Sequence, residues 1–208
     1  MRLKKKVRVF LIILLFLAAF LVAFLIWKGH KAKPTEVEEV KVINQVEKYG
    51  YNLKENKPEA YKKMFEELKE ILNESTVDEE AYAKKIAEMF VYDFYSLEDK
   101  TAKTDIGGVE FISPAILENF LQNAQDTYYK YIESNVYNNR KQKLQVVKDI
   151  TIDSIEKQSF TYGDTTDENA YIIKTSWDYT DSQFSNYQKS ATLVFIHEDI
   201  KLYLVELQ

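Results

Sequence analysis

The spacing of apolar residues changes once along this 208-residue chain, near Gln142. Before that point, apolar residues recur every three or four positions, as on one face of an α-helix. After it, apolar and polar residues alternate in VVKDITIDSI, AYIIKTSWDYT, KSATLVFIHE and IKLYLVEL, which is typical of β-strands. Short connections between these four segments predict antiparallel neighbours. Helices followed by such a run of strands indicate an α+β fold.

The second predicted strand indicates how the sheet is covered. Five of its residues share one largely aromatic face: Tyr171, Ile173, Thr175, Trp177 and Tyr179. The opposite face, from Ile172 to Asp178, is mostly polar. We therefore expect helices on one face only of a curved, four-stranded antiparallel sheet.

Four helices are predicted before the strands. The first covers about residues 37–49, ends at Gly50 and is expected to form a stalk. The second runs from Pro58 to about Asn73. The third follows Thr76, which with Glu79 has the spacing of a capping box, and runs to about Leu97. The fourth begins at Ser113 and Pro114 and continues to about Ile132.

Residues 9–27 form an uncharged apolar run, VFLIILLFLAAFLVAFLIW, which is long enough to span most of a bilayer core. Five basic residues precede this run and three follow it closely, so the N-terminus is expected to be cytoplasmic. We predict a cytoplasmic basic tail (1–8), a transmembrane helix (9–27), a juxtamembrane linker with stalk helices (28–74) and an extracytoplasmic domain (75–208). A cleaved signal peptide is the alternative interpretation of the apolar run.

The charge distribution limits the possible partners. Residues 1–33 contain eight basic and no acidic residues, which leaves 20 basic and 33 acidic residues, a net charge of −13, for residues 34–208. Such a domain repels phosphate backbones, so we do not expect nucleic-acid binding. The chain has no cysteine and only two histidines, so we expect no metal site and no cofactor.

The segment TDIGGVEFISP, residues 104–114, contains two of the five glycines. It lacks the lysine and the spacing of a phosphate-binding loop. We expect a turn with positive φ at Gly107 or Gly108, followed by a short strand, VEFI. The segment would then join the third and fourth helices.

Candidate site residues fall into two groups, each with a structural alternative. Asp105, Asp178 and His197 could contribute an acid–histidine pair, although His197 could equally be a surface residue beside a turn. Seven aromatic residues could line a ligand pocket or simply form the core: Phe90, Phe94, Phe111, Phe120, Tyr128, Trp177 and Tyr179.

The order of helices, VEFI, a further helix and four strands resembles the cone-shaped α+β fold of the nuclear transport factor 2-like superfamily over residues 76–208. With one N-terminal membrane segment, the layout is most similar to the bitopic scaffold subunit of type IV secretion and conjugation systems. This resemblance implies protein assembly at a membrane.

The function expected from the sequence is therefore that of a single-pass membrane protein of the cell membrane. Its extracytoplasmic domain would act as a non-catalytic interaction or assembly module, with protein partners or as a homo-oligomer. A small-ligand-binding domain and, third, an enzyme are the alternatives.

Overall fold

The computed structural model describes residues 40–208. The predicted basic tail (1–8), the predicted transmembrane helix (9–27) and the first part of the linker (28–39) lie outside the described residues. Among residues 40–208, no helix is both long and apolar enough to cross a membrane.

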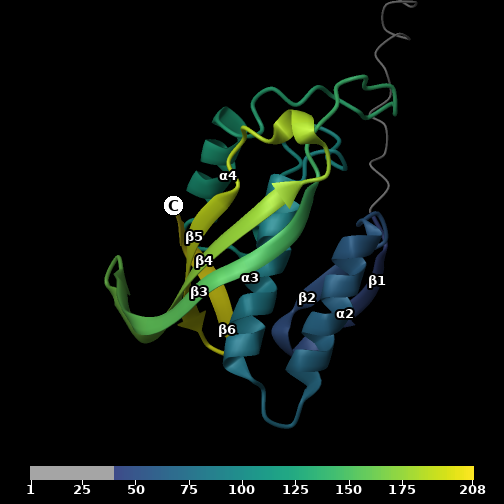
Figure 1. The fold of residues 1–208 in the computed structure, drawn as a ribbon. Helices are drawn as coiled ribbons and strands as arrows, with labels where there is room; N and C mark the ends of the chain where they lie inside the picture. The colour runs from purple at the N-terminus through teal and green to yellow at the C-terminus, as the bar shows by residue number, and fades with distance from the viewer. Residues whose placement is uncertain (1–39) are drawn as a thin grey trace, which may run out of the picture. The chain divides into compact units, whose positions relative to one another are not determined.

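The described chain is an α+β domain in which helices pack against a four-stranded antiparallel sheet (Figure 1), as predicted. The sheet contains β3 (Val147–Tyr162), β4 (Thr165–Tyr179), β5 (Ser190–Glu198) and β6 (Lys201–Leu207), each beside the next in chain order. The helices are α2 (Glu59–Asn73), α3 (Glu79–Tyr95) and α4 (Leu117–Asp126). A separate hairpin joins β1 (Val42–Val46) to β2 (Tyr51–Lys54). Three short 3-10 turns cover Glu47–Tyr49, Val109–Phe111 and Ser182–Phe184.

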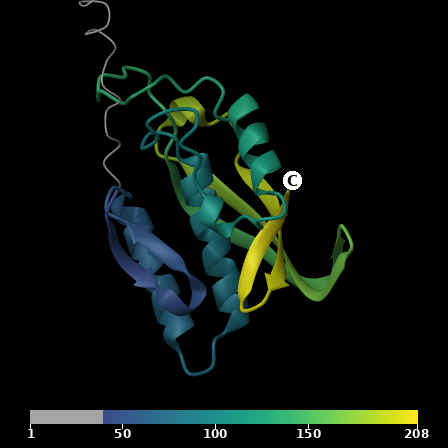
Figure 2. The same cartoon turned by 180° about the vertical axis from the view of Figure 1, so that it is seen from behind.

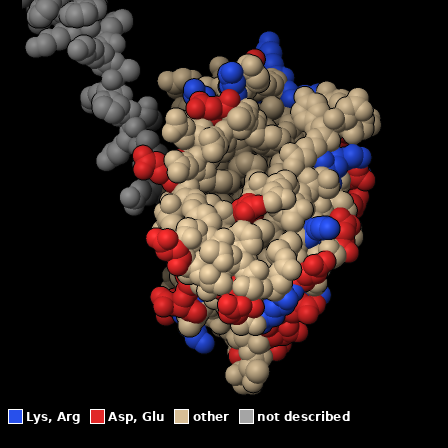
Figure 3. All heavy atoms as spheres, turned by 90° about the vertical axis from the view of Figure 1, so that its left-hand side faces the viewer, with Lys and Arg blue, Asp and Glu red and all other residues tan. Residues whose placement is uncertain are grey.

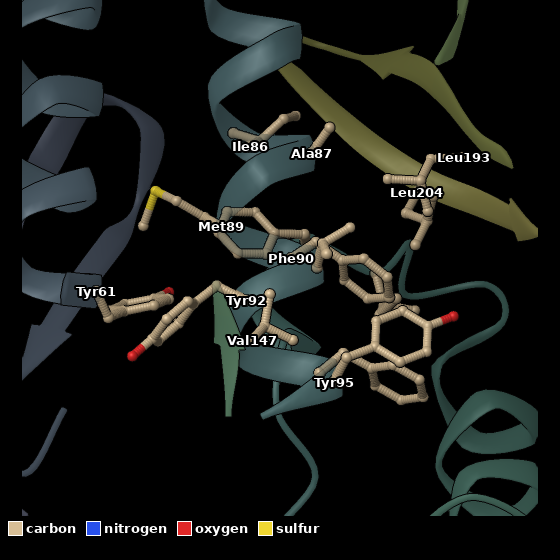
Figure 4. Close-up of a cluster of buried hydrophobic side chains, with 14 of the residues drawn as sticks. Tyr61, Ile86, Ala87, Met89, Phe90, Tyr92, Tyr95, Val147, Leu193 and Leu204 are labelled. Carbon is tan, nitrogen blue, oxygen red and sulfur yellow. The ribbon is translucent and has the colours of Figure 1, made fainter. Parts of the chain in front are cut away.

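Helix α3 lies at the centre of the domain, between the β1–β2–α2 part and the sheet (Figures 1 and 2). It is apolar on more than one face, as expected for a helix buried on opposite sides. In the close-up of Figure 4, Tyr61 and Met89 lie on the α2 side, whereas Leu193 and Leu204 lie on the sheet side. The predicted inner face of β4, from Tyr171 to Tyr179, is buried against this layer.

The predicted stalk helix is wrong for the described part of residues 37–49, which forms β1 and the 3-10 turn that leads into β2. The period of three in Val40, Ile43, Val46 and Tyr49 imitates a helical face, but Gly50 has a φ of 68° and turns the chain back. The following residues alternate, so that Tyr51 and Leu53 are buried and their neighbours are exposed. Residues 40–74 therefore belong to the same compact unit as the sheet.

The starts of α3 and α4 also differ from the prediction. Asp78 caps α3, because its carboxylate accepts a hydrogen bond from the Ala81 N–H at 3.0 Å, so the Thr76 capping box is wrong. Ser113 does not cap α4, since the helix begins only at Leu117 with Ile116 at the N-cap position, and the Ser113 hydroxyl donates to Glu198 at 2.6 Å. The helix itself ends at Asp126 rather than near Ile132.

Strands β3 and β4 are longer than predicted. They continue through TYGDTTDEN, predicted as a connection, to a tight turn that contains Gly163, with a φ of 57°. Phe160 and Tyr162 of this hairpin pack with Val194, Ile196 and Val205, which lie outside the main core. The register of β3 against β4 shifts at three places, between Lys148 and Thr151, Ile152 and Ser154, and Gln158 and Phe160.

The segment 104–114 joins α3 to α4, and Gly108 has the predicted positive φ, 72°. The VEFI strand is wrong: residues Val109–Phe111 form a 3-10 turn, and Ile112 alone makes a parallel bridge to Leu204 of β6. Gly107 lies against the backbone of α3, where a Cβ would be 1.9 Å from the carbonyl oxygen of Asp93. Only glycine fits this contact.

A buried carboxylate, Asp93 of α3, holds the segment 104–114 against this helix. It accepts hydrogen bonds from the Gly108 N–H at 2.7 Å, the Lys57 ammonium at 2.6 Å and the Lys100 ammonium at 2.9 Å. Burial would raise the pKa of Asp93, but the charges and hydrogen bonds of Lys100 and Lys57 outweigh it and lower the pKa to about 2. Three segments of the chain therefore meet at one ionised group.

Gly107→Ala is expected to lower the free energy of unfolding by about 2 kcal/mol or more. The segment 104–114 must move away from α3 to admit the new methyl group. Gly50→Ala is the control: Gly50 has a positive φ, but no atom lies within 4 Å of the place that its new methyl group would take, so only about 1 kcal/mol should be lost. Urea denaturation measures both. Equal losses would contradict the close contact with Asp93.

Candidate functional site

An open groove runs between α4 and the end of β6. It consists of two adjoining hollows of about 280 Å³ and 520 Å³, which share Phe94, Thr127 and Leu207. We call it the aromatic groove, and its remaining lining residues are Tyr95, Ile116, Asn119, Phe120, Asn123, Ala124, Tyr128, Gln188 and Gln208. None of these side chains is charged. Figure 3 shows a hollow on this side of the molecule, with mostly uncharged residues around it.

The seven aromatic residues singled out from the sequence divide between core and groove. Phe90, Phe111, Trp177 and Tyr179 are buried in the core, and the indole Nε1 of Trp177 finds no hydrogen-bond partner among the described residues. Phe120 and Tyr128 are half-buried and line the groove, and Phe94 is a buried core residue that also lines it.

The rings of the groove pack against one another. The Phe94 ring centre lies 5.3 Å from that of Phe120 and 5.6 Å from that of Tyr128. Such contacts fill the space between helices and sheet with side chains. The remaining volume is therefore at the surface, beside α4.

The three candidate catalytic residues do not come together. Asp105 accepts hydrogen bonds from the N–H and the hydroxyl of Thr101. Asp178 is exposed and forms an ion pair with Lys189 at 2.9 Å. The pair that was considered between Asp178 and His197 does not form, because His197 contacts other carboxylates.

His197 lies between two carboxylates that the sequence prediction missed. Its Nδ1 is 2.7 Å from the Asp167 carboxylate, and its Nε2 is 3.0 Å from that of Glu79. Glu79 also accepts hydrogen bonds from the Tyr171 hydroxyl at 2.8 Å and the Lys157 ammonium at 2.9 Å. We call these five residues the histidine cluster.

The electrostatics of the histidine cluster favour a structural role. Burial would raise the pKa of Glu79, but the hydrogen bonds from Lys157, Tyr171 and His197 outweigh it and lower the pKa to about 2. The pKa of Asp167 is also lowered, because hydrogen bonds from the backbone and ring of His197 and from the Asn169 N–H outweigh its burial. A strongly ionised carboxylate is a poor general base or acid near neutral pH. The cluster instead joins α3, the β3–β4 hairpin and β5.

No signal in the sequence points to the histidine cluster, because Glu79 and His197 are 118 positions apart. Within residues 40–208, no group of three or more histidine, aspartate or glutamate side chains is arranged to hold a metal ion.

No family model, curated protein sequence or solved structure matches this chain.

Glu79→Gln is expected to remove a pH-dependent part of the stability. The folded-state pKa of Glu79, about 2, is below its ordinary value of 4.5, so its contribution is complete above about pH 5 and disappears as the pH falls toward 2. Because the side chain is 42% exposed, solvent screening limits this contribution to about 1 kcal/mol. Urea denaturation across this pH range measures the difference from the wild-type chain.

The control is Glu80→Gln, which removes only a surface ion pair with Lys84 and should cost less than about 0.5 kcal/mol. If Glu79→Gln lowers the free energy of unfolding by the same amount at neutral pH and near pH 2, the proposed role of the Glu79 charge is contradicted.

Proposed function

We propose that this chain is a single-pass protein of the cell membrane. Its extracytoplasmic domain binds and assembles other proteins and does not catalyse a reaction. The observation that carries the proposal is the aromatic groove, an uncharged surface that α4 and β6 leave open. Aromatic side chains are enriched at protein interfaces, and the half-buried rings of Phe120 and Tyr128 lie here beside the exposed Asn119 and Asn123. Side chains fill most of the aromatic interior, so the groove is the part of it that remains open to a partner.

The shape of the groove favours a protein segment over a small ligand. Small-molecule sites enclose most of the ligand surface in a concave pocket. Here one hollow lies beside α4 and the next lies past the end of that helix, at Thr127 and Tyr128, and both remain open to solvent. An elongated occupant can fill both hollows at once.

The membrane location is supported by the apolar run at residues 9–27 and its basic flanks. The acidic domain that follows favours protein partners over nucleic acid. The resemblance in element order to the nuclear transport factor 2-like superfamily and its membrane-anchored secretion scaffolds favours assembly as the role.

Asn123 is replaced by a photo-cross-linking amino acid in the intact chain, which is kept in its own membrane. Irradiation is expected to give an adduct heavier than the chain alone. Asn123 is exposed and lines the groove. Gln122 is the control position, since it is exposed on the same helix but does not line the groove. Phe120→Ala in the Asn123 variant should weaken the adduct, because it removes part of the apolar lining.

Adducts of equal strength from both positions, or from neither, would contradict binding at the groove. Recovery of the chain in the soluble fraction would contradict the membrane anchor.

A further inference from the structure

The free edge of β6 explains what kind of segment the groove can hold. In an antiparallel pair, every second residue directs its N–H and C=O away from the partner strand. On β6 the Leu202 N–H points outward and donates to the Tyr82 hydroxyl at 3.2 Å. The Leu204 C=O points outward and accepts from the Ser113 N–H at 3.0 Å. The protein itself therefore provides partners for the first part of this edge.

Leu207 is the next outward-facing position, because a register shift near Val194 and Phe195 moves the alternation by one residue. Its neighbour Gln208 exchanges two backbone hydrogen bonds with Thr192, at 2.9 Å and 3.0 Å, which places Leu207 in a non-hydrogen-bonded pair with Leu193. No described residue bonds the outward backbone groups of Leu207. This open position lines the aromatic groove.

The chain already shows that this edge accepts an extended segment. Ile112, which is extended, makes a parallel bridge to Leu204, and the Ser113 N–H donates to the Leu204 C=O, so a single residue of the chain pairs with this edge. Pro114 follows and has no N–H with which to continue the pairing. The chain then turns into α4, and the edge beyond Leu204 is left open beside the groove.

The lining of the groove determines the chemistry of its occupant. Because the lining contains no charged side chain, a charged side chain of the occupant would lose water without gaining an oppositely charged side chain as its partner. Phe94 and Phe120 provide apolar contacts, and the amides of Asn119, Asn123 and Gln188 provide neutral hydrogen-bonding groups. An uncharged extended segment with apolar side chains at alternate positions is complementary to this surface.

We propose that a partner protein adds such a segment to the edge of β6 as an extra strand. Its backbone pairs with Leu207, and an apolar side chain packs on Phe94 and Phe120. Strand addition of this kind takes affinity from the backbone and specificity from alternate side chains. The inference rests on the proposed function, because it specifies how the groove binds its partner.

The test uses the full chain in lipid nanodiscs and a library of uncharged seven-residue peptides with leucine, isoleucine, valine or phenylalanine at alternate positions. Fluorescence polarisation is expected to find binders. Leu207→Pro should weaken them roughly fivefold to tenfold, because it removes the outward N–H but no hydrogen bond within the sheet. Leu207→Val is the matched control and should change the affinity by less than about twofold, since the N–H remains.

A second measurement does not depend on the folding of a variant. The best peptide is resynthesised with alternate backbone amides methylated, in both registers, and tested against the wild-type chain. One register should lose binding and the other should retain it, because a strand pairs through every second residue.

The outcomes separate this inference from the proposed function. One outcome is that Phe120→Ala weakens peptide binding, whereas neither Leu207→Pro nor methylation of the peptide backbone in either register does so. This outcome would overturn strand addition but would keep the groove as a binding surface. Absence of any peptide binder together with absence of a cross-link at Asn123 would overturn both. Self-association that Leu207→Pro abolishes, without peptide binding, would replace the partner protein with a second copy of this chain.

Discussion

The ion cluster at Asp93 is the interaction on which the arrangement of the domain depends. A buried carboxylate is costly unless hydrogen bonds and opposite charges compensate it, and here Lys57, Lys100 and the Gly108 N–H do so. The two lysines stand before α2 and after α3, so one residue of the central helix fixes both neighbouring segments. Removal of the Asp93 carboxylate would take from the buried Lys100 one of its two ion-pair partners, and loss of a partner in a buried ion pair typically costs several kcal/mol.

The position of the aromatic groove follows from this cluster. With Gly107 and Gly108 held against α3, residues Phe111–Ser113 reach the edge of β6, and the chain enters α4 from there. Helix α4 therefore stands beside β6 and forms one wall of the groove, while Phe94 of α3 contributes to its floor. The histidine cluster stabilises a different part of the domain, where the start of α3 contacts the β3–β4 hairpin and β5.

Local patterns predicted much of the fold, and contacts between distant segments account for most of the rest. The alternation in β4 and the apolar face of α2 come from neighbouring residues, so the sequence shows them directly. The β1–β2 hairpin was missed because a period of three suits both a helix and an irregular hairpin with a left-handed glycine. Phe94, Phe120 and Tyr128 were identified as candidates, but the hollow that they line depends on where α4 ends. The partners of Asp93 and His197 are brought together only by the folded chain.

The two edges of the sheet are unlike each other. Three register shifts and the left-handed Asp149, with a φ of 51°, interrupt the outer edge of β3, and such irregularities hinder pairing with another strand. The edge of β6 is regular at Leu207 and open. Within the described sheet a partner strand can therefore pair only with β6, so the domain offers its partner a single edge and a single orientation of the sheet.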